Sequence, residues 1–75
     1  MIMADRYVLK RVLGTEAFEG MPFSSEEQAL EKAAKLFDEH GPNFQLEIWL
    51  NDMPPALRGA TWMADWYRHR KLSSN

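Results

Sequence analysis

Residues 24–52, SSEEQALEKAAKLFDEHGPNFQLEIWLND, decide the fold, because a helical pattern is followed directly by an alternating one. Ser24 stands three residues before Glu27, which is the spacing of a capping box, and Gly41 supplies a stop signal. We therefore predict a helix at about 25–39. Its apolar residues recur at helical spacing and form one stripe: Ala29, Leu30, Ala33, Ala34 and Phe37.

The second half of this stretch alternates between apolar and polar residues, as a half-buried strand does. The apolar face carries four residues: Phe44, Leu46, Ile48 and Leu50. Trp49 is the exception, because it is a large aromatic residue on the polar face. Asp52, Met53 and the proline pair that follows end this strand, since proline cannot donate to a ladder.

The residues before the helix predict two short strands. Residues 6–13, RYVLKRVL, are rich in β-branched and aromatic residues and favour a first strand. A helix capped by Asp5 is the alternative for this stretch. A short second strand is predicted around Phe18, and it should pair with the first strand as a hairpin.

Residues 56–71 favour a second helix, with Pro55 well suited to its first position. A strand remains the alternative, although alanine and aspartate within it argue against that. As a helix the segment has two apolar sides. One side is formed by Leu57, Ala60, Ala64 and Tyr67, and the roughly opposite side by Trp62, Met63 and Trp66.

These elements predict a small α+β domain with the order ββαβα. Its mainly antiparallel sheet should pack the first helix on one face, and the second helix should cover the other face or one end. We predict one domain over 1–75, with an ordered core at about 5–71 and a flexible tail at 72–75.

The length of 75 residues implies a thin hydrophobic core, so a homodimer is as much an expectation as a monomer. The chain has no cysteine, which excludes disulfides, thiolate metal sites and cysteine nucleophiles. No apolar run approaches the length of a membrane span, and the beginning of the chain does not resemble a signal peptide. We therefore expect a cytoplasmic protein with no membrane partner.

Catalytic and cofactor motifs are not found in the sequence. The two histidines, His40 and His69, have no ligand-type spacing around them. There is no nucleophile elbow, phosphate-binding loop or glycine-rich fingerprint. We accordingly predict no metal site, no cofactor and no enzymatic activity.

The candidate binding residues gather in residues 61–72, TWMADWYRHRKL. One interpretation is structural, in which Trp49 meets Trp62 or Trp66 in a buried aromatic cluster. The other is a recognition surface, because Trp, Tyr and Arg are the residue types enriched at binding hot spots. In the second case at least one of these two helix tryptophans should be exposed, beside Arg68, His69 or Arg70. The predicted partner-binding residues are Trp49, Trp62, Trp66, Arg68, His69, Arg70 and Lys71.

The function expected from these features is non-catalytic protein binding. The chain would be a small adaptor or inhibitor that occludes a host enzyme or a defence complex. By analogy alone, phage and mobile elements encode such proteins, including anti-CRISPR-like inhibitors. A nucleic-acid-binding module is the alternative, since both ends of the chain are basic around an acidic middle. It would use cations from both ends: Arg6, Lys10, Arg11, Arg68, Arg70 and Lys71. A self-assembling structural subunit is the third possibility.

Overall fold

The computed structural model describes residues 5–13, 16–17, 20–41 and 43–73. Its elements run in the order β1 (Tyr7–Leu13), β2 (Glu16–Ala17), β3 (Met21–Phe23), α1 (Glu26–His40), β4 (Leu46–Leu50) and α2 (Ala60–Ser73). The α+β class and the strand–helix–strand–helix order are confirmed. The second strand was predicted around Phe18, which lies outside the described residues, and β2 and β3 flank that position.

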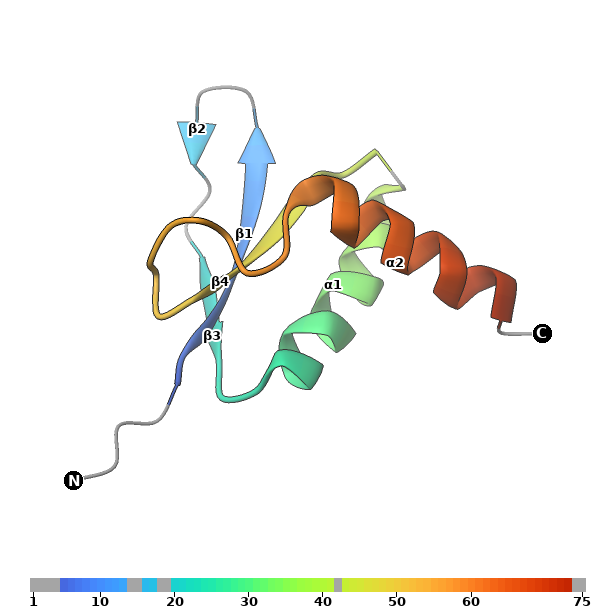
Figure 1. Cartoon of the computed structure of the whole chain (residues 1–75). Coiled ribbons are helices and arrows are strands. Elements are labelled where there is room, and N and C mark those ends of the chain that lie inside the picture. Colours follow the sequence, from blue (N-terminus) through green and yellow to red (C-terminus); the bar gives the residue numbers. More distant parts are fainter. Residues whose placement is uncertain (1–4, 14–15, 18–19, 42, 74–75) are drawn as a thin grey trace.

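Strand β1 is the centre of an antiparallel sheet (Figure 1). It pairs with β2 near its end, where Val12 lies opposite Ala17, so the predicted pairing of the first two strands is confirmed. Leu9 lies opposite Met21 of β3 and also opposite Ile48 of β4. Because β3 and β4 pair with the same residues of β1, they must lie on its two opposite edges.

The two faces of the sheet have different surroundings. Leu9 and Ile48 point toward the helices and are fully buried there. Val8, the next residue of β1, must point to the opposite face because side chains alternate along a strand. Val8 is nevertheless only 3% exposed, and it lies opposite Trp49 and Pro22 in the two neighbouring strands. β1 therefore contributes buried residues to both faces.

Helix α1 begins one residue later than the capping box predicted. The cap is Ser25, whose side chain accepts a hydrogen bond from the backbone N–H of Gln28 at 3.2 Å. Ser24 instead donates its backbone N–H and its hydroxyl to the Gln28 side chain. The predicted pairing of Ser24 with Glu27 was wrong, because the capping residues are Ser25 and Gln28, each one position later in the chain. Gly41 ends the helix with φ 94°, and its N–H bonds to the carbonyl of Phe37, as expected of a C-terminal cap.

Helix α2 confirms that the last segment is helical and not a strand, but it begins at Ala60 and not near residue 56. The predicted start at Pro55 was wrong because Arg58 forms an antiparallel bridge with Ile48, so the chain bends and then pairs with β4 before α2 begins. At its other end α2 continues through Ser73, two residues into the predicted tail. Residues 74 and 75 lie outside the described residues.

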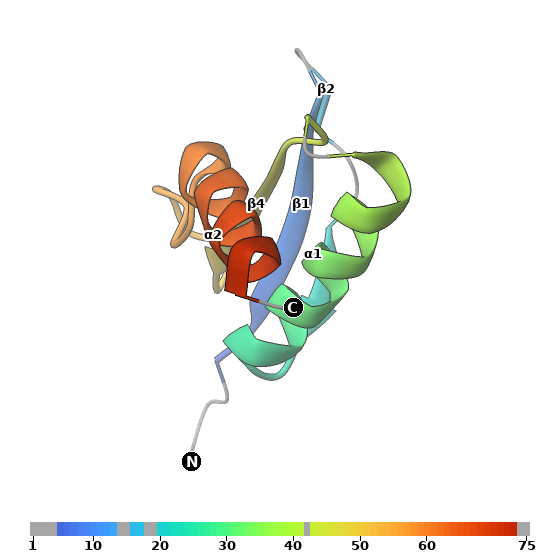
Figure 2. The ribbon, with the colours of Figure 1, turned by 90° about the vertical axis from the view of Figure 1, so that its right-hand side faces the viewer.

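Both helices lie on the same face of the sheet (Figure 2), so α2 does not cover the opposite face as one alternative predicted. The rings of Phe37 in α1 and Tyr67 in α2 stack with centroids 4.8 Å apart. Met63 and Tyr67 are one turn apart and are the buried residues of α2. They come from the two different apolar sides that we predicted, so neither side was the true packing face. The core cluster consists of Leu9, Ala29, Ala33, Phe37, Leu46, Ile48, Met63 and Tyr67.

Candidate protein-interaction surface

Each of the three tryptophans has a cation over its ring, but the three rings do not form one cluster. Trp49 lies on the sheet face away from the helices, whereas Trp62 and Trp66 belong to α2. The predicted meeting of Trp49 with a tryptophan of α2 was wrong. Helix α2 packs beside α1 on one face of the sheet (Figure 2), and Trp49 lies on the other face. The cation–ring pairs are Lys10–Trp49 at 4.3 Å, Arg58–Trp62 at 4.3 Å and Arg70–Trp66 at 5.6 Å.

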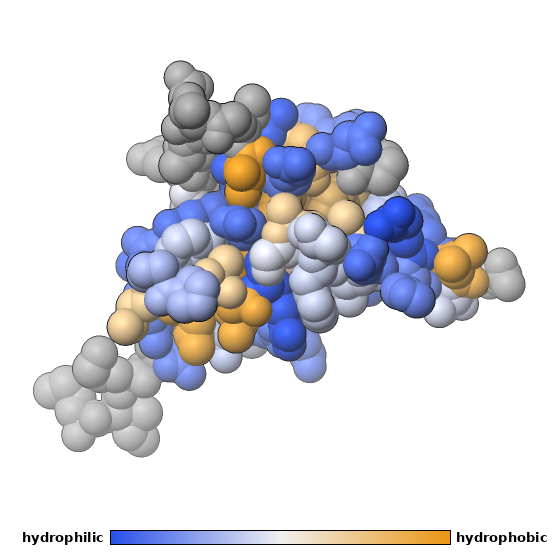
Figure 3. All heavy atoms as spheres, turned by 45° about the horizontal axis from the view of Figure 1, so that its top comes forward, coloured by the Kyte–Doolittle hydropathy of each residue, from blue (hydrophilic) through white to orange (hydrophobic). Residues whose placement is uncertain are grey.

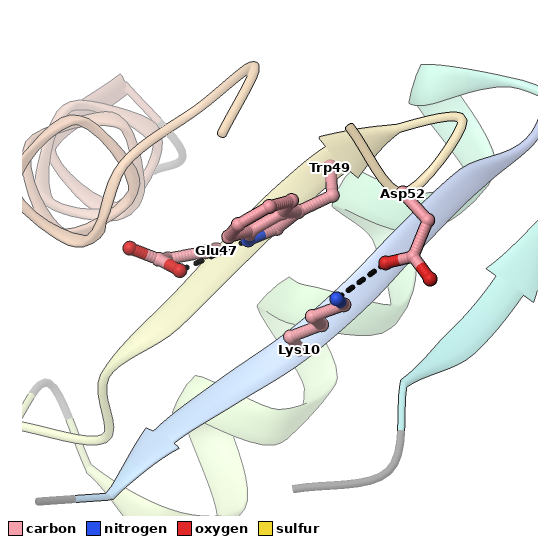
Figure 4. Close-up of polar contacts among 4 residues, drawn as sticks. All are labelled: Lys10, Glu47, Trp49 and Asp52. Carbon is pink, nitrogen blue, oxygen red and sulfur yellow. Dashed lines mark hydrogen bonds and ion pairs between the residues drawn. The ribbon is translucent and has the colours of Figure 1, made fainter. Parts of the chain in front are cut away.

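Trp49 is held in place by its neighbours on the sheet (Figure 4). Its indole Nε1 donates a hydrogen bond to Glu47 at 3.0 Å, and the ammonium of Lys10 lies over its ring. The same ammonium is paired with the carboxylate of Asp52, and that hydrogen bond lowers the pKa of Asp52. All of these polar groups are satisfied within the protein. Trp49 is half-buried, so it contributes a stiff aromatic patch to this face and not a free side chain.

The predicted basic cluster of α2 is compensated by acidic residues. Arg68 pairs with Asp65 in the same helix. The other two pairs connect α2 to α1, and they are Arg70–Glu31 at 3.4 Å and Lys71–Asp38 at 2.9 Å. The acidic middle and the basic end of the chain thus meet each other in the folded protein. His69 is exposed on the same helix. Lys10 is separated from these cations by the sheet, so it does not extend their patch.

Asp38 receives two hydrogen bonds from α2, and they make a pH-dependent contact. The Tyr67 hydroxyl and the Lys71 ammonium both donate to it, and these bonds lower the pKa of Asp38 below its ordinary 3.8. The hydrogen bond with Asp38 raises the pKa of both Tyr67 and Lys71. A lowered acid pKa stabilises the fold above 3.8, and this stabilisation is lost as the pH falls through the folded-state value.

We expect the melting temperature to fall on acidification below 3.8, and Asp38→Asn should weaken that dependence because the titrating carboxyl is removed. The raised pKa values of Tyr67 and Lys71 mean that the folded state holds these protons more tightly than the unfolded state. The free energy of unfolding should therefore decline in strong alkali, as both groups lose their protons. Circular dichroism melts of both proteins across pH measure this. Glu39→Gln removes an exposed acid from the same end of α1 and is the matched control. Parallel pH profiles for the wild type and Asp38→Asn would contradict the assignment.

Large exposed apolar side chains lie mainly in the connection between β4 and α2 and in the first turn of α2. Among the described residues four are exposed: Met53 (65%), Leu57 (38%), Trp62 (38%) and Leu72 (79%). Three of these lie within residues 53–62, and Pro54 and Pro55 between them are exposed as well. We call the side chains of Met53, Pro54, Pro55, Leu57 and Trp62 the loop surface. Figure 3 shows hydrophobic residues gathered at the lower left, on the side of the molecule where this connection lies.

Backbone hydrogen bonds hold both ends of this connection. At its start Asn51 and Asp52 adopt positive φ values of 55° and 58°, which form a tight turn closed by a bond from Met53 N to Leu50 O at 3.2 Å. Asn51 also donates its N–H to the Arg6 carbonyl at 2.7 Å, which ties the turn to the sheet.

At the other end of the connection two hydrogen bonds of 3.0 Å join Arg58 to Ile48. The Arg58 guanidinium lies over Trp62 and bonds to Glu26 of α1 at 2.8 Å. Ile48 and Arg58 are paired in antiparallel directions, so the residue after Ile48 lies near the residue before Arg58. Trp49 and Leu57 are therefore neighbours at one end of the bridge. The loop surface therefore joins the part of the sheet that carries Trp49.

The sequence identified only part of this surface. The expectation that one helix tryptophan is exposed is met by Trp62, but its cation is Arg58 and not one of the cations that follow it. Trp66 is half-buried against the core beneath Arg70. Met53 and Leu57 were missed, because the first was read as a strand end and the second as part of the helix. The adjacent prolines were the available signal, since proline has no backbone N–H to donate and is typical of turns and loops.

No group of three or more metal-ligating side chains occurs in the part of the chain that the structure describes. Within those same residues no helix is both long and apolar enough to cross a membrane. Comparison with protein-family models, with curated proteins and with solved structures finds no match for this chain.

Proposed function

We propose that the protein is a non-catalytic protein-binding module, a small adaptor or inhibitor that acts by covering part of its partner. The observation that carries this proposal is the gathering of exposed apolar side chains in the loop surface. Burying apolar area is favourable by roughly 25 cal/mol per Å², and contiguous exposed apolar surface is typical of interaction sites. A single exposed leucine such as Leu72 needs no such explanation.

Trp62 and Arg58 support a binding hot spot at the end of the loop surface. Trp and Arg are two of the residue types that contribute most to protein–protein affinity. Here the Arg58 guanidinium is already positioned by Glu26, so little side-chain freedom would be lost on binding. The Trp62 ring is partly exposed beside it, which leaves area for a partner to cover.

Nucleic-acid binding is supported less well by the same structure. Such binding requires cations that can neutralise phosphates and release counterions. Arg68, Arg70 and Lys71 each have an acidic partner, and the acids Glu31 and Asp38 would repel a phosphate backbone at the same place. Lys10 is likewise paired with Asp52. A polyanion would have to displace these carboxylates.

Affinity capture from the native host's lysate, with and without nuclease, tests the proposal. The wild-type chain should retain a protein that survives nuclease treatment and that binds directly after purification. Trp62→Ala should weaken this binding by about 2 kcal/mol or more, roughly 30-fold, because a hot-spot side chain is removed. Leu72→Ala is the matched control, since Leu72 is exposed but lies outside the loop surface. Isothermal titration calorimetry with the purified partner measures both variants.

Three outcomes would count against the proposal. Loss of the captured material on nuclease treatment would favour the nucleic-acid alternative. Equal binding by Trp62→Ala and Leu72→Ala would remove the loop surface from the interface. If the chain captures only itself and sediments as a dimer, the self-assembling alternative is supported instead.

A further inference from the structure

Residues 53–57, Met-Pro-Pro-Ala-Leu, form the projecting part of the loop surface and carry no charge. Figure 1 shows the chain between β4 and α2 curling out from the strands, and Figure 2 shows it on the far side of α2 from α1. Four of these five residues are exposed, and Ala56 is the intermediate one. The segment is therefore a convex, apolar projection.

The projection is held at both ends by bonds that do not involve its own side chains. The turn at Asn51 and Asp52 fixes the entry, and the double hydrogen bond between Ile48 and Arg58 fixes the exit. Two prolines restrict the backbone between these points. A loop that is ordered before binding loses less conformational freedom when it binds, which raises affinity for a fixed set of contacts.

Two of the charges that border the projection are paired: Asp52, immediately before it, with Lys10, and Arg58, immediately after it, with Glu26. Arg6 also lies beside Met53 and Asp52 at the base of the projection. The projecting residues themselves carry no charge for a partner to recognise. An uncharged projection is best covered by apolar surface, and a concave surface covers more of a convex loop than a flat one does.

Resting on the proposed function, we infer that the partner protein contains an apolar cleft and that residues 53–57 insert into it. Met53 is more exposed than Leu57, at 65% against 38%, and enters deepest, and its unbranched thioether adapts to an irregular pocket. Trp62 and Arg58 lie at the rim of the cleft, outside the inserted residues. Because apolar contacts dominate, the affinity depends only weakly on salt.

The test uses the full chain and the partner obtained by affinity capture. A photo-crosslinking amino acid replaces Met53, Leu57 or, as the control, Leu72, and mass spectrometry maps the partner residues that become attached. We expect attachment from positions 53 and 57 to residues that line one apolar cleft, and none from position 72. In the same titration Met53→Asp should weaken binding roughly 100-fold or more, because a carboxylate would be buried without a partner. Met53→Leu should bind within about threefold of the wild type.

Each result bears on the inference. If the partner is captured but cross-links come only from position 72, or attach to a flat charged surface, the cleft is wrong and the protein-binding proposal stands. Affinity that falls steeply with salt would also overturn the apolar cleft. If the wild-type chain captures no protein at all, both proposals fail together. Met53 is exposed in the free protein, so Met53→Asp should leave the melting temperature unchanged. If Met53→Asp does change the melting temperature, its weaker binding is not counted, and the cross-linking result alone tests the insertion of residues 53–57.

Discussion

Phe37→Ala should lower the free energy of unfolding by about 3–5 kcal/mol, because it empties a buried aromatic site. Phe37 is 1% exposed and contributes to the cluster that joins α1, α2 and the sheet. A domain of this length has a total stability of roughly 4–11 kcal/mol, so the substitution removes a large part of it. Urea unfolding followed by circular dichroism measures the loss.

Two further variants separate the contributions at this site. Leu36→Ala alters the neighbouring half-buried residue, and it should cost clearly less than Phe37→Ala. Phe37→Leu keeps most of the apolar volume but removes the stack on Tyr67, a contact worth about 0.5–1.5 kcal/mol beyond burial. If Phe37→Ala costs no more than Leu36→Ala, the packing of α2 against α1 is not part of the core.

Gly20→Ala should cost about 1–3 kcal/mol, because it inserts a methyl group where there is no space. A β-carbon at Gly20 would lie 2.2 Å from Cγ1 of Val8 and 3.2 Å from Cγ of Lys10. Val8 cannot easily move away, since its side chain is branched and it lies between β3 and β4 in the centre of the sheet. The cost therefore comes from steric overlap and not from a change in backbone preference.

A double-mutant cycle identifies this overlap. Val8→Ala removes the colliding methyl group, so the Gly20→Ala cost should shrink in the Val8→Ala background, with a coupling of about 0.5–3 kcal/mol. Gly59→Ala is the matched control, because a β-carbon at Gly59 meets no atom within 4 Å. Its effect should add to that of Val8→Ala. Additive effects for Gly20→Ala as well would show that Gly20 is not required for space.

The elements that were predicted best are those whose sequence signals lie within the element itself. The helix α1 and the strand β4 were located from the apolar spacing and the glycine stop at Gly41, and these signals act within a few residues. The placement of α2 depends instead on the stack between Phe37 and Tyr67, which are 30 positions apart. Because both sides of the α2 sequence are apolar, no local pattern could show which side would be buried. The start of α2 was missed for the same reason, since the bridge between Arg58 and Ile48 is a tertiary contact.

The sequence predicted which types of residue would form the candidate surface, but not which individual residues would lie together there. The sequence indicated that tryptophans and cations would lie together, and the structure places a cation over every tryptophan. It could not indicate that Arg58 would be the cation beside Trp62, because Arg58 is positioned by Glu26 from the start of α1. It also could not show that Arg70 and Lys71 of α2 would be paired with acids of α1. That pairing is what shifts the candidate site from the end of the chain to residues 53–62.

The protection of the sheet edges has a consequence for how the protein behaves when it is crowded. Strand β3 lies at one edge, and its central residue, Pro22, has no N–H to offer to an incoming strand. At the other edge Ile48 already exchanges both of its backbone hydrogen bonds with Arg58. The middle of each edge strand therefore offers few free backbone groups to a strand from another molecule, and such groups are what nucleate fibrils. A second copy that contacts the apolar tip would find little backbone at the centre of either edge with which to extend the sheet.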